Sequence, residues 1–172
     1  FGKWRLDGET PDKALLGRGS YGRVYSIYRE EKDSTGSVCR YSAALKVIPI
    51  DEETVCPNSS ASRESKQEIL NRELRIVRGE IEIMRRMEGE CSNIAYFQNS
   101  VIIRRMDTDL ESWDVLIAME KLIVLPKYME ESGLVPGSYS YLKRVLYIWK
   151  EIGAALSVCE RNSILHTDVK PG

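Results

Sequence analysis

Three glycines near the start of the chain, Gly17, Gly19 and Gly22, have the spacing G-x-G-x-x-G, and Val24 follows two residues after the last of them. Glycines at this density allow backbone N–H groups to approach an anion closely, as a phosphate-binding loop requires. A dinucleotide-binding unit would continue into a helix at this point. Residues 24–28 are instead β-branched and aromatic, which is typical of a strand. The stretch therefore predicts the tip of a β-hairpin, either a flap over phosphates or an ordinary glycine-rich turn.

A second candidate is Lys46, which lies inside the strongly apolar segment 41–50. This segment predicts a strand that pairs with the strand after the glycines, which places Lys46 beneath the hairpin. A lysine in such a strand either occupies an edge or solvent-facing position or is retained because its ammonium meets an anion. Next to the glycine pattern, we favour the second interpretation.

Two glutamates of the following helix are candidate partners for that lysine. Ser65, with Glu68 three residues later, has the spacing of a capping box and predicts the start of a long helix. Glu73 and Glu80 fall within an otherwise apolar stripe of this helix. A carboxylate there either pairs with a cation, for which Lys46 is the obvious choice, or lies at the solvated margin of the stripe.

Further elements must hold these groups in place. Residues 115–119 form a continuous apolar run, as in a strand buried on both faces, and the polar exit at 120–122 offers backbone N–H and C=O groups at the rim of a pocket. Pro126 marks the opening of a short helix. A longer helix is predicted over 140–159, and we expect its regularly spaced apolar residues to be core. They are Leu142, Val145, Leu146, Trp149, Ile152 and Leu156.

Composition limits the classes of protein. The 172 residues are 42% hydrophobic and 30% charged, enough for a packed core, and the net charge of -1 gives no field that favours nucleic acid. Four scattered cysteines without a C-x-x-C pair, together with a single histidine, predict no metal site and suit reduced thiols in a cytoplasmic protein. No apolar run approaches the roughly 20 residues of a membrane span, so we expect no membrane contact within this stretch.

The last stretch of the chain points to a family. Residues 166–171 are His-Thr-Asp-Val-Lys-Pro, and with the G-x-G-x-x-G-x-V stretch and the Ala44-Leu45-Lys46 strand they resemble the signature set of the eukaryotic-type protein kinases. The resemblance implies an α+β fold in which an antiparallel small lobe with one long helix precedes the first helices of a truncated α-helical large lobe. It divides the chain into a lead-in at 1–13, the ATP-binding lobe and hinge at 14–122, and the start of the large lobe at 123–172.

The same resemblance assigns roles to individual residues. Lys46, steered by Glu80, would hold the α- and β-phosphates of ATP, Asp168 would position the substrate hydroxyl and accept its proton, and Lys170 would steady the γ-phosphate. Lys170, two residues after Asp168, is similar to the serine/threonine branch. The positions implied for ATP are Leu16, Gly17, Gly19, Ser20, Gly22, Val24, Ala44, Lys46, Met119, Glu120 and Leu122.

Two departures from the family pattern keep an alternative open. Thr167 replaces the arginine of His-Arg-Asp, and the asparagine that binds Mg²⁺ in this family is expected just after Gly172. The first interpretation is an ATP- and Mg²⁺-dependent protein Ser/Thr kinase, with metal ligands outside this stretch. The alternative is a pseudokinase or a truncated module that binds nucleotide or a partner without catalysis. A truncated large lobe would leave apolar helix faces exposed, which predicts self-association.

Overall fold

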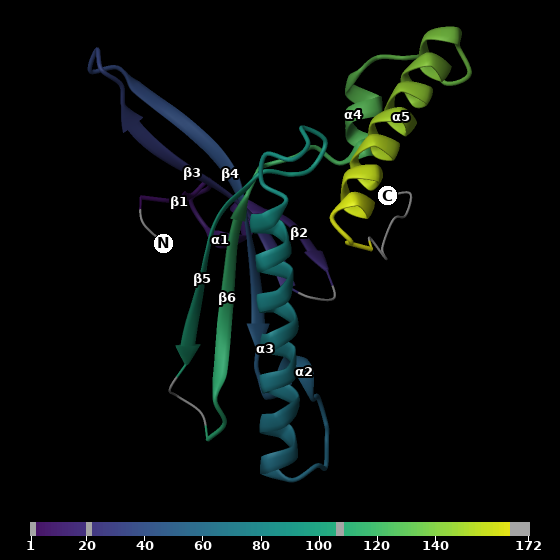
Figure 1. The fold of residues 1–172 in the computed structure, drawn as a ribbon. Helices are drawn as coiled ribbons and strands as arrows, with labels where there is room; N and C mark the ends of the chain where they lie inside the picture. Colours follow the sequence, from purple (N-terminus) through teal and green to yellow (C-terminus); the bar gives the residue numbers. More distant parts are fainter. Residues whose placement is uncertain (1–2, 20–21, 106–108, 166–172) are drawn as a thin grey trace. The chain divides into compact units, whose positions relative to one another are not determined.

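The structure, a computed structural model, describes residues 3–19, 22–105 and 109–165, and these residues form an α+β protein (Figure 1). One six-stranded antiparallel sheet is accompanied by several helices, two of them long. The elements in chain order are β1 (Arg5–Leu6), α1 (Pro11–Ala14), β2 (Leu15–Gly19), β3 (Gly22–Lys32), β4 (Val38–Ile50), α2 (Glu52–Val55), α3 (Arg63–Arg86), β5 (Phe97–Arg105), β6 (Ser112–Met119), α4 (Leu125–Glu131) and α5 (Tyr139–Arg161).

The sheet brings together strands that carry the candidate residues. Its order is β1-β3-β4-β6-β5, and β2 also pairs with β3. Every pairing is antiparallel. The glycine stretch, the lysine strand and the apolar run at 115–119 therefore lie on β2–β3, β4 and β6, which are neighbours in space. This confirms the predicted antiparallel sheet with one long helix in the chain segment between β4 and β5.

Helix α3 packs on one face of the sheet through a single apolar stripe. Leu70, Leu74, Val77 and Ile81 are buried, at the 4-3-4 spacing that places them on one side of a helix. They contact a cluster of buried residues from β4 and β6. Burial of each such side chain stabilises the fold by about 1.5–3 kcal/mol. The sheet-side members of the cluster include Ile48, Ile50, Val115 and Ile117.

Several local expectations were wrong, and the reasons are physical. The predicted capping box is not formed, because the hydroxyl of Ser62 accepts the N–H of Ser65 and the helix begins earlier. The polar stretch that follows β4 contains α2, which has no periodic sequence pattern and whose first turn is capped by Asp51. Likewise, the expected lead-in contains β1 and α1. These elements are two to four residues long, and tertiary pairing rather than sequence periodicity stabilises them.

The chain divides into two compact units. The first comprises residues 1–85 and 97–121, and the second comprises residues 86–96 and 122–172. In the second unit, α5 spans Tyr139–Arg161, with Ser138 as its N-cap and Asn162 as its C-cap, which confirms the helix predicted over 140–159. The segment 86–96 is tied to this helix, since the amide of Asn93 donates to the Glu151 carboxylate at 2.6 Å. The boundary between units falls between residues 121 and 122, one residue before the predicted end of the hinge.

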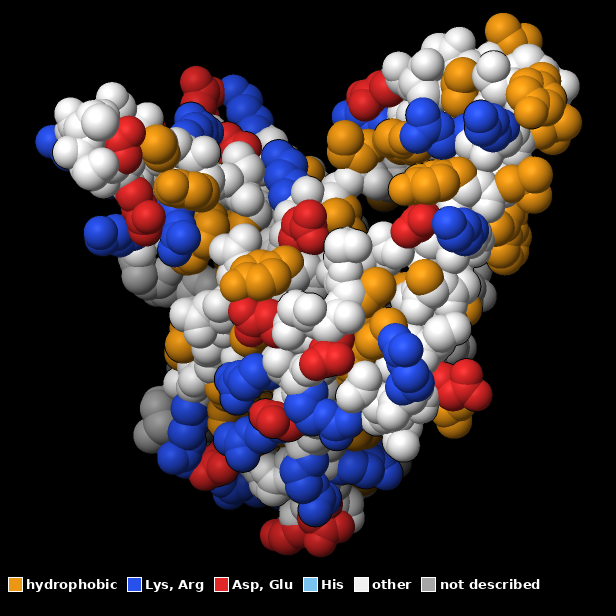
Figure 2. Space-filling model, turned by 45° about the horizontal axis from the view of Figure 1, so that its top comes forward, with side chains coloured by type: hydrophobic (Ala, Val, Ile, Leu, Met, Phe, Trp, Pro, Cys, Tyr) orange, Lys and Arg blue, Asp and Glu red, His pale blue; other side chains and the backbone are white. Residues whose placement is uncertain are grey.

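Helix α5 exposes apolar residues that were expected to be core. Leu142, Leu146 and Trp149 are among the most exposed large side chains, with 65% of Trp149 accessible. The half-buried face of the helix carries Val145 and Ile152 instead. Figure 2 shows apolar side chains on the surface of this helical unit, whereas Lys and Arg are interspersed with Asp and Glu over the rest of the visible face. The periodicity identified the helix correctly but could not tell which apolar face is covered.

Within residues 3–19, 22–105 and 109–165, no helix combines the length and the apolar character needed to cross a membrane.

Candidate functional site

The glycine stretch is a β-hairpin, as predicted. Strands β2 and β3 pair with Gly17 opposite Val24 and Gly19 opposite Gly22. The connection between them contains Ser20, which lies outside the described residues. Because a strand rather than a helix follows the glycines, the dinucleotide-binding arrangement is excluded here. Leu16, also assigned to the site, lies on β2 and is exposed.

The three glycines of the hairpin differ in what surrounds them. Gly22 has a φ of +138°, and a Cβ atom built on it would lie 2.1 Å from the carbonyl oxygen of Val47. The fold itself therefore requires glycine at position 22. At Gly17 and Gly19 a Cβ atom would meet nothing within 4 Å. The described structure gives no packing reason for these two glycines, and the space beside them is open to a ligand.

The lysine of β4 lies directly beside this hairpin. Lys46 is opposite Val24 on β3 and opposite Ile117 on β6, so it occupies an interior strand rather than an edge. Side chains alternate along a strand, which places Lys46 on the same face as the buried Ile48 and Ile50. It is half-buried. The edge or solvent-facing explanation of this lysine is therefore wrong.

Three other assigned residues lie on the same face of the sheet. Ala44 is opposite Met119, and Val24 is its diagonal neighbour across the β3–β4 pair. Ala44 is buried, and Met119 packs at the edge of the α3 cluster. Val24, Ala44 and Met119 thus form an apolar surface next to Lys46, with dimensions set by neighbouring strands about 4.8 Å apart.

The predicted ion pair between Lys46 and helix α3 is not formed. Among the described residues Lys46 has no ion pair or hydrogen bond through its side chain. Glu80 is exposed, because it precedes the buried Ile81 by one residue, which is about 100° around the helix. The reserve candidate, Glu73, is half-buried and has Arg72 at 3.9 Å. The ammonium of Lys46 therefore lacks an anionic partner within the part of the chain that the structure describes.

The expected hinge follows β6 without regular structure. The backbone groups of residues 121–123 form no hydrogen bond with another backbone group of the described chain. Glu120 and Lys121 end the first unit, and Leu122, 62% exposed, begins the second. Backbone N–H groups without a backbone partner can donate hydrogen bonds to the edge of a heterocycle, and such C=O groups can accept them.

The candidate catalytic residues of the last stretch, Asp168 and Lys170, lie outside the described residues. Within the described ranges, no group of three or more His, Cys, Asp or Glu side chains is arranged to hold a metal ion. The four cysteines are free.

Sequence reasoning missed a polar cluster that adjoins this face. The carboxylate of Asp7 accepts from the hydroxyl of Ser26 at 2.8 Å and from Arg40 at 2.7 Å, and the ammonium of Lys121 donates to Ser26 at 2.7 Å. The hydrogen bond from Ser26 is the main cause that lowers the pKa of Asp7, and the two cations add to it against the opposing effect of burial. One signal was available: Thr10-Pro11 is a typical helix start, which argues against an unstructured lead-in.

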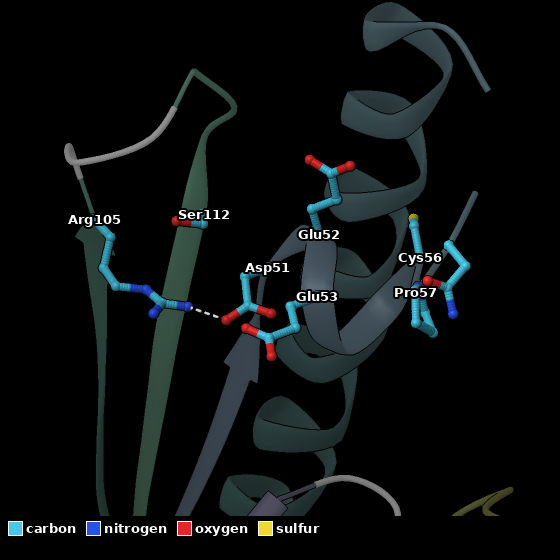
Figure 3. A pocket seen from close by; sticks show the side chains of 8 residues that line it. Asp51, Glu52, Glu53, Cys56, Pro57, Arg105 and Ser112 are labelled. Atoms are coloured by element: carbon cyan, nitrogen blue, oxygen red, sulfur yellow. Dashed lines mark hydrogen bonds and ion pairs between the residues drawn. The ribbon is translucent and has the colours of Figure 1, made fainter. Parts of the chain in front are cut away.

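A cleft of about 470 Å³ lies elsewhere, between α2 and the ends of β5 and β6 (Figure 3). Two of its charged groups, Asp51 and Arg105, pair with each other, and Glu52 pairs with Lys66. Asp51 caps α2 through the N–H of Thr54 and also pairs with Arg105, which in turn lies near Asp114. Burial raises the pKa of Asp51, but the bonds from Thr54 and Arg105 outweigh it and lower the pKa overall. We interpret this cleft as a structural ion-pair cluster.

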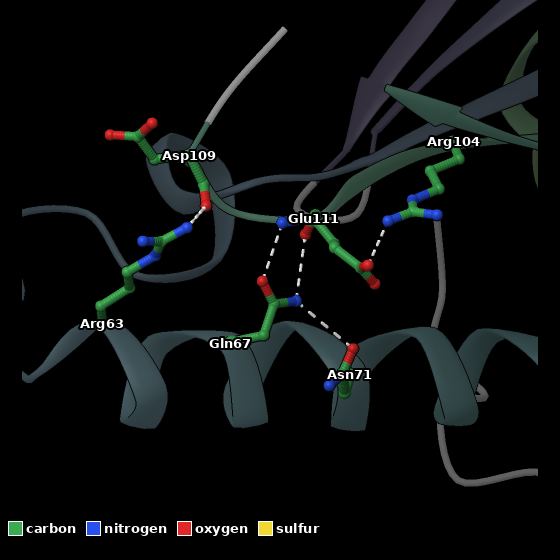
Figure 4. A network of polar contacts seen from close by, with 6 residues as sticks. All are labelled: Arg63, Gln67, Asn71, Arg104, Asp109 and Glu111. Atoms are coloured by element: carbon green, nitrogen blue, oxygen red, sulfur yellow. Dashed lines mark hydrogen bonds and ion pairs between the residues drawn. The ribbon is translucent and has the colours of Figure 1, made fainter. Parts of the chain in front are cut away.

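A second network fixes α3 against the sheet (Figure 4). The side chain of Gln67 accepts the N–H of Glu111 at 2.7 Å and donates to the carbonyl of the same residue at 3.2 Å. Arg63 also donates to the carbonyl of Asp109. The amino-terminal half of α3 is therefore held to the start of β6 by backbone contacts as well as by the apolar stripe.

No model of a known protein family matches this chain, and no curated protein matches it either. The functional conclusion therefore depends on the residues and on their geometry. That geometry joins an open glycine hairpin, a lysine without an anionic partner in the described part of the chain, and an apolar strand surface. Together they can bind a molecule that has both a phosphate and a flat apolar ring.

Proposed function

We propose that the first unit binds ATP and that the protein is a Ser/Thr protein kinase. The observation that carries the proposal is the position of Lys46, half-buried in an apolar sheet face, directly opposite Val24 and without an anionic partner among the described residues. Burial of an ammonium is costly unless an anion meets it. A phosphate between the hairpin and Lys46 would supply that anion.

The residues present fit ATP at each of its parts. The open backbone at Gly17 and Gly19, with Lys46 beneath, suits phosphates. The apolar surface of Val24, Ala44 and Met119 suits an adenine ring. Backbone groups that follow β6 suit the polar edge of that ring. The described residues offer no ligand set for Mg²⁺.

The chemistry expected from the family resemblance matches these residue types. Phosphoryl transfer depends on positioning and charge neutralisation more than on covalent help from the protein. Lys46 would neutralise the α- and β-phosphates, and Lys170 would steady the γ-phosphate. Asp168 would orient the substrate hydroxyl and take its proton as the new P–O bond forms and ADP leaves with the electrons of the broken bond. ATP supplies the transferable phosphoryl group, and a protein serine or threonine receives it.

One observation favours a second candidate, a nucleotide-binding module without catalysis. Neither Glu73 nor Glu80 contacts Lys46, so the lysine is not oriented by α3 in this structure. A lysine that binds phosphate without such orientation would still give nucleotide affinity but would not hold it in a reactive position.

The cellular setting is part of the proposal. Four free cysteines suit a reducing compartment, and we place the protein in the cytoplasm with ATP and a protein substrate as its partners.

Phosphate transfer decides between the two candidates. The natural protein, incubated with labelled ATP, Mg²⁺ and a mixed Ser/Thr protein substrate, should label serine and threonine. Lys46→Met should reduce transfer by at least about 100-fold, as expected when a preorganised charge is removed. The control Lys32→Met alters an exposed lysine at the far end of β3 and should leave transfer unchanged.

Equal transfer by wild type and Lys46→Met would contradict the proposed mechanism. Binding of ATP without any transfer, by wild type and by the Lys32 control, would establish the second candidate instead.

A further inference from the structure

The amino-terminal segment is built into the sheet next to the proposed nucleotide site. Strand β1 pairs with β3, with Arg5 opposite Tyr28 and Leu6 opposite Ile27. The backbone N–H of the next residue, Asp7, donates to the carbonyl of Ser26 at 2.8 Å. The ladder therefore carries the Asp7 carboxylate to a defined position on β3.

At that position a buried serine links the carboxylate to a lysine from the other end of the unit. Ser26 is only 4% exposed. Its hydroxyl donates to Asp7 Oδ2 at 2.8 Å and accepts from Lys121 Nζ at 2.7 Å, and Lys121 Nζ lies 3.6 Å from the same carboxylate oxygen. A hydroxyl has one proton to donate. Ser26 donates it to the Asp7 carboxylate, which as a charged group is the stronger acceptor.

The other carboxylate oxygen is also held. Arg40 donates to Asp7 Oδ1 at 2.7 Å, and its guanidinium lies 3.8 Å from the ring centroid of Tyr28. Both oxygens of Asp7 are thus fixed by partners on β3, on β4 and after β6. Two cations and one carboxylate leave a net positive charge in the cluster, so removal of the carboxylate would leave two cations with only a hydroxyl between them.

The cluster is continuous with the apolar surface assigned to the adenine. Ser26 is opposite Ala44, and Ala44 is opposite Met119. Lys121 comes two residues after Met119. The hydrogen bond of Lys121 to Ser26 therefore anchors the start of segment 121–123. The backbone groups of this segment have no backbone partner in the described chain. A segment without such bonds depends on side-chain contacts for its position.

We propose that Asp7 is a positioning residue for the nucleotide: through Ser26 and Lys121 it fixes the backbone of residues 119–121, so that the amino-terminal segment completes the ATP site. The inference rests on the proposed function for the identity of the ligand. It does not place Asp7 among the groups that touch ATP. Its prediction is that loss of the carboxylate loosens residues 119–121 first and weakens ATP binding as a consequence.

Hydrogen exchange of residues 119–121, read by mass spectrometry together with ATP titration, tests this. Asp7→Asn should raise exchange there by at least about fivefold relative to wild type, since local opening becomes easier. It should also weaken ATP binding, raising the dissociation constant by about 3–10-fold, with a smaller effect for Asp7→Glu. The matched control is Glu9→Gln, which neutralises an exposed carboxylate whose ion pair among the described residues is with Lys13.

Lys121→Met keeps the aliphatic stem and provides a second route if Asp7→Asn folds poorly. It should give the same two effects, and the double variant should add little to either single change, because both remove one shared contact. Exchange at 119–121 that is unchanged in both variants would overturn the inference. If the wild-type chain fails to bind ATP while Asp7→Asn still raises exchange, the positioning contact is supported and the proposed function fails.

Discussion

At the residue scale, the three glycines of the G-x-G-x-x-G motif have different structural roles. Gly22 adopts a backbone conformation reserved for glycine and leaves no room for a Cβ atom against Val47, whereas Gly17 and Gly19 have open space. We therefore expect Gly22→Ala to destabilise the fold by about 2–4 kcal/mol, because strain and a backbone clash combine. Thermal unfolding measured by circular dichroism checks this.

The open glycines should show the opposite pattern. Gly17→Ala and Gly19→Ala should leave the melting temperature within about 2 °C of wild type but weaken ATP binding by about 10-fold, because the added methyl groups block close approach of phosphate. Titration calorimetry measures the affinity. Retained ATP affinity in both variants would mean that the hairpin is an ordinary turn and that no phosphate lies against it.

Asp7 gives a prediction about pH. Its pKa is lowered, first by the hydrogen bond from Ser26 and then by Arg40 and Lys121 against the effect of burial. A carboxyl group whose pKa is lower in the folded state stabilises the fold above the unfolded pKa of about 3.9 and loses this contribution as the pH falls through the lowered value. At pH 7, Asp7→Asn should reduce the melting temperature by about 2–5 °C, a range that allows for the partial exposure of the site.

The same comparison at acid pH provides the check. The difference between wild type and Asp7→Asn should shrink steadily below about pH 4. A difference that stays constant from pH 7 to acid pH would show that the carboxylate charge contributes nothing at this site.

At the scale of elements, α3 is held in place by Gln67 as much as by its apolar stripe. The side chain of Gln67 uses both its polar atoms on the backbone of Glu111. Gln67→Ala should remove both of these solvent-exposed hydrogen bonds and lower the free energy of unfolding by about 0.5–1.5 kcal/mol. Asn71→Ala is the matched control, since Asn71 contacts only Gln67 in this network, at 3.4 Å. Urea unfolding that gives equal values for both variants would contradict this role.

Elements with a strong local pattern were predictable from the sequence. The hairpin at the glycines, the lysine strand, the apolar run of β6 and the existence of α5 all follow from alternation and helical spacing. Strand β1 and helix α2 were missed because each is short and is stabilised by partners far away in the chain.

The candidate site, like the fold, was predictable from the sequence only in part. The sequence indicated which strands carry Lys46, Ala44 and Met119, and the antiparallel pairing places them on one face. The helix partner of Lys46 could not be predicted, because stripe membership does not determine how α3 is rotated on the sheet. The stripe centred on Leu74 and Val77 was buried, and this turned Glu80 toward solvent. The contact of Asp7 with Lys121 has no sequence pattern at all.

At the scale of the whole molecule, α5 exposes an apolar face to solvent. Leu142, Leu146 and Trp149 lie one or two helical turns apart and are all exposed. Large contiguous apolar surface promotes association in water. We expect the 172-residue chain to self-associate in sedimentation velocity at about 50 µM, and we expect the double change Leu146→Lys and Trp149→Lys to return it to monomer. Lys143→Gln, a polar change on the same helix, is the control. A wild-type chain that sediments as a monomer would contradict this expectation.

The central claim, that Lys46 and the glycine hairpin form a phosphate site for ATP, is tested most directly by calorimetric titration of ATP into wild type, Lys46→Met and Lys32→Met. The claim predicts binding by wild type and by Lys32→Met within about twofold of each other, and at least about 10-fold weaker binding by Lys46→Met, a loss of about 1.4 kcal/mol or more. Equal affinity of all three proteins for ATP, or no binding by any folded form, would contradict it.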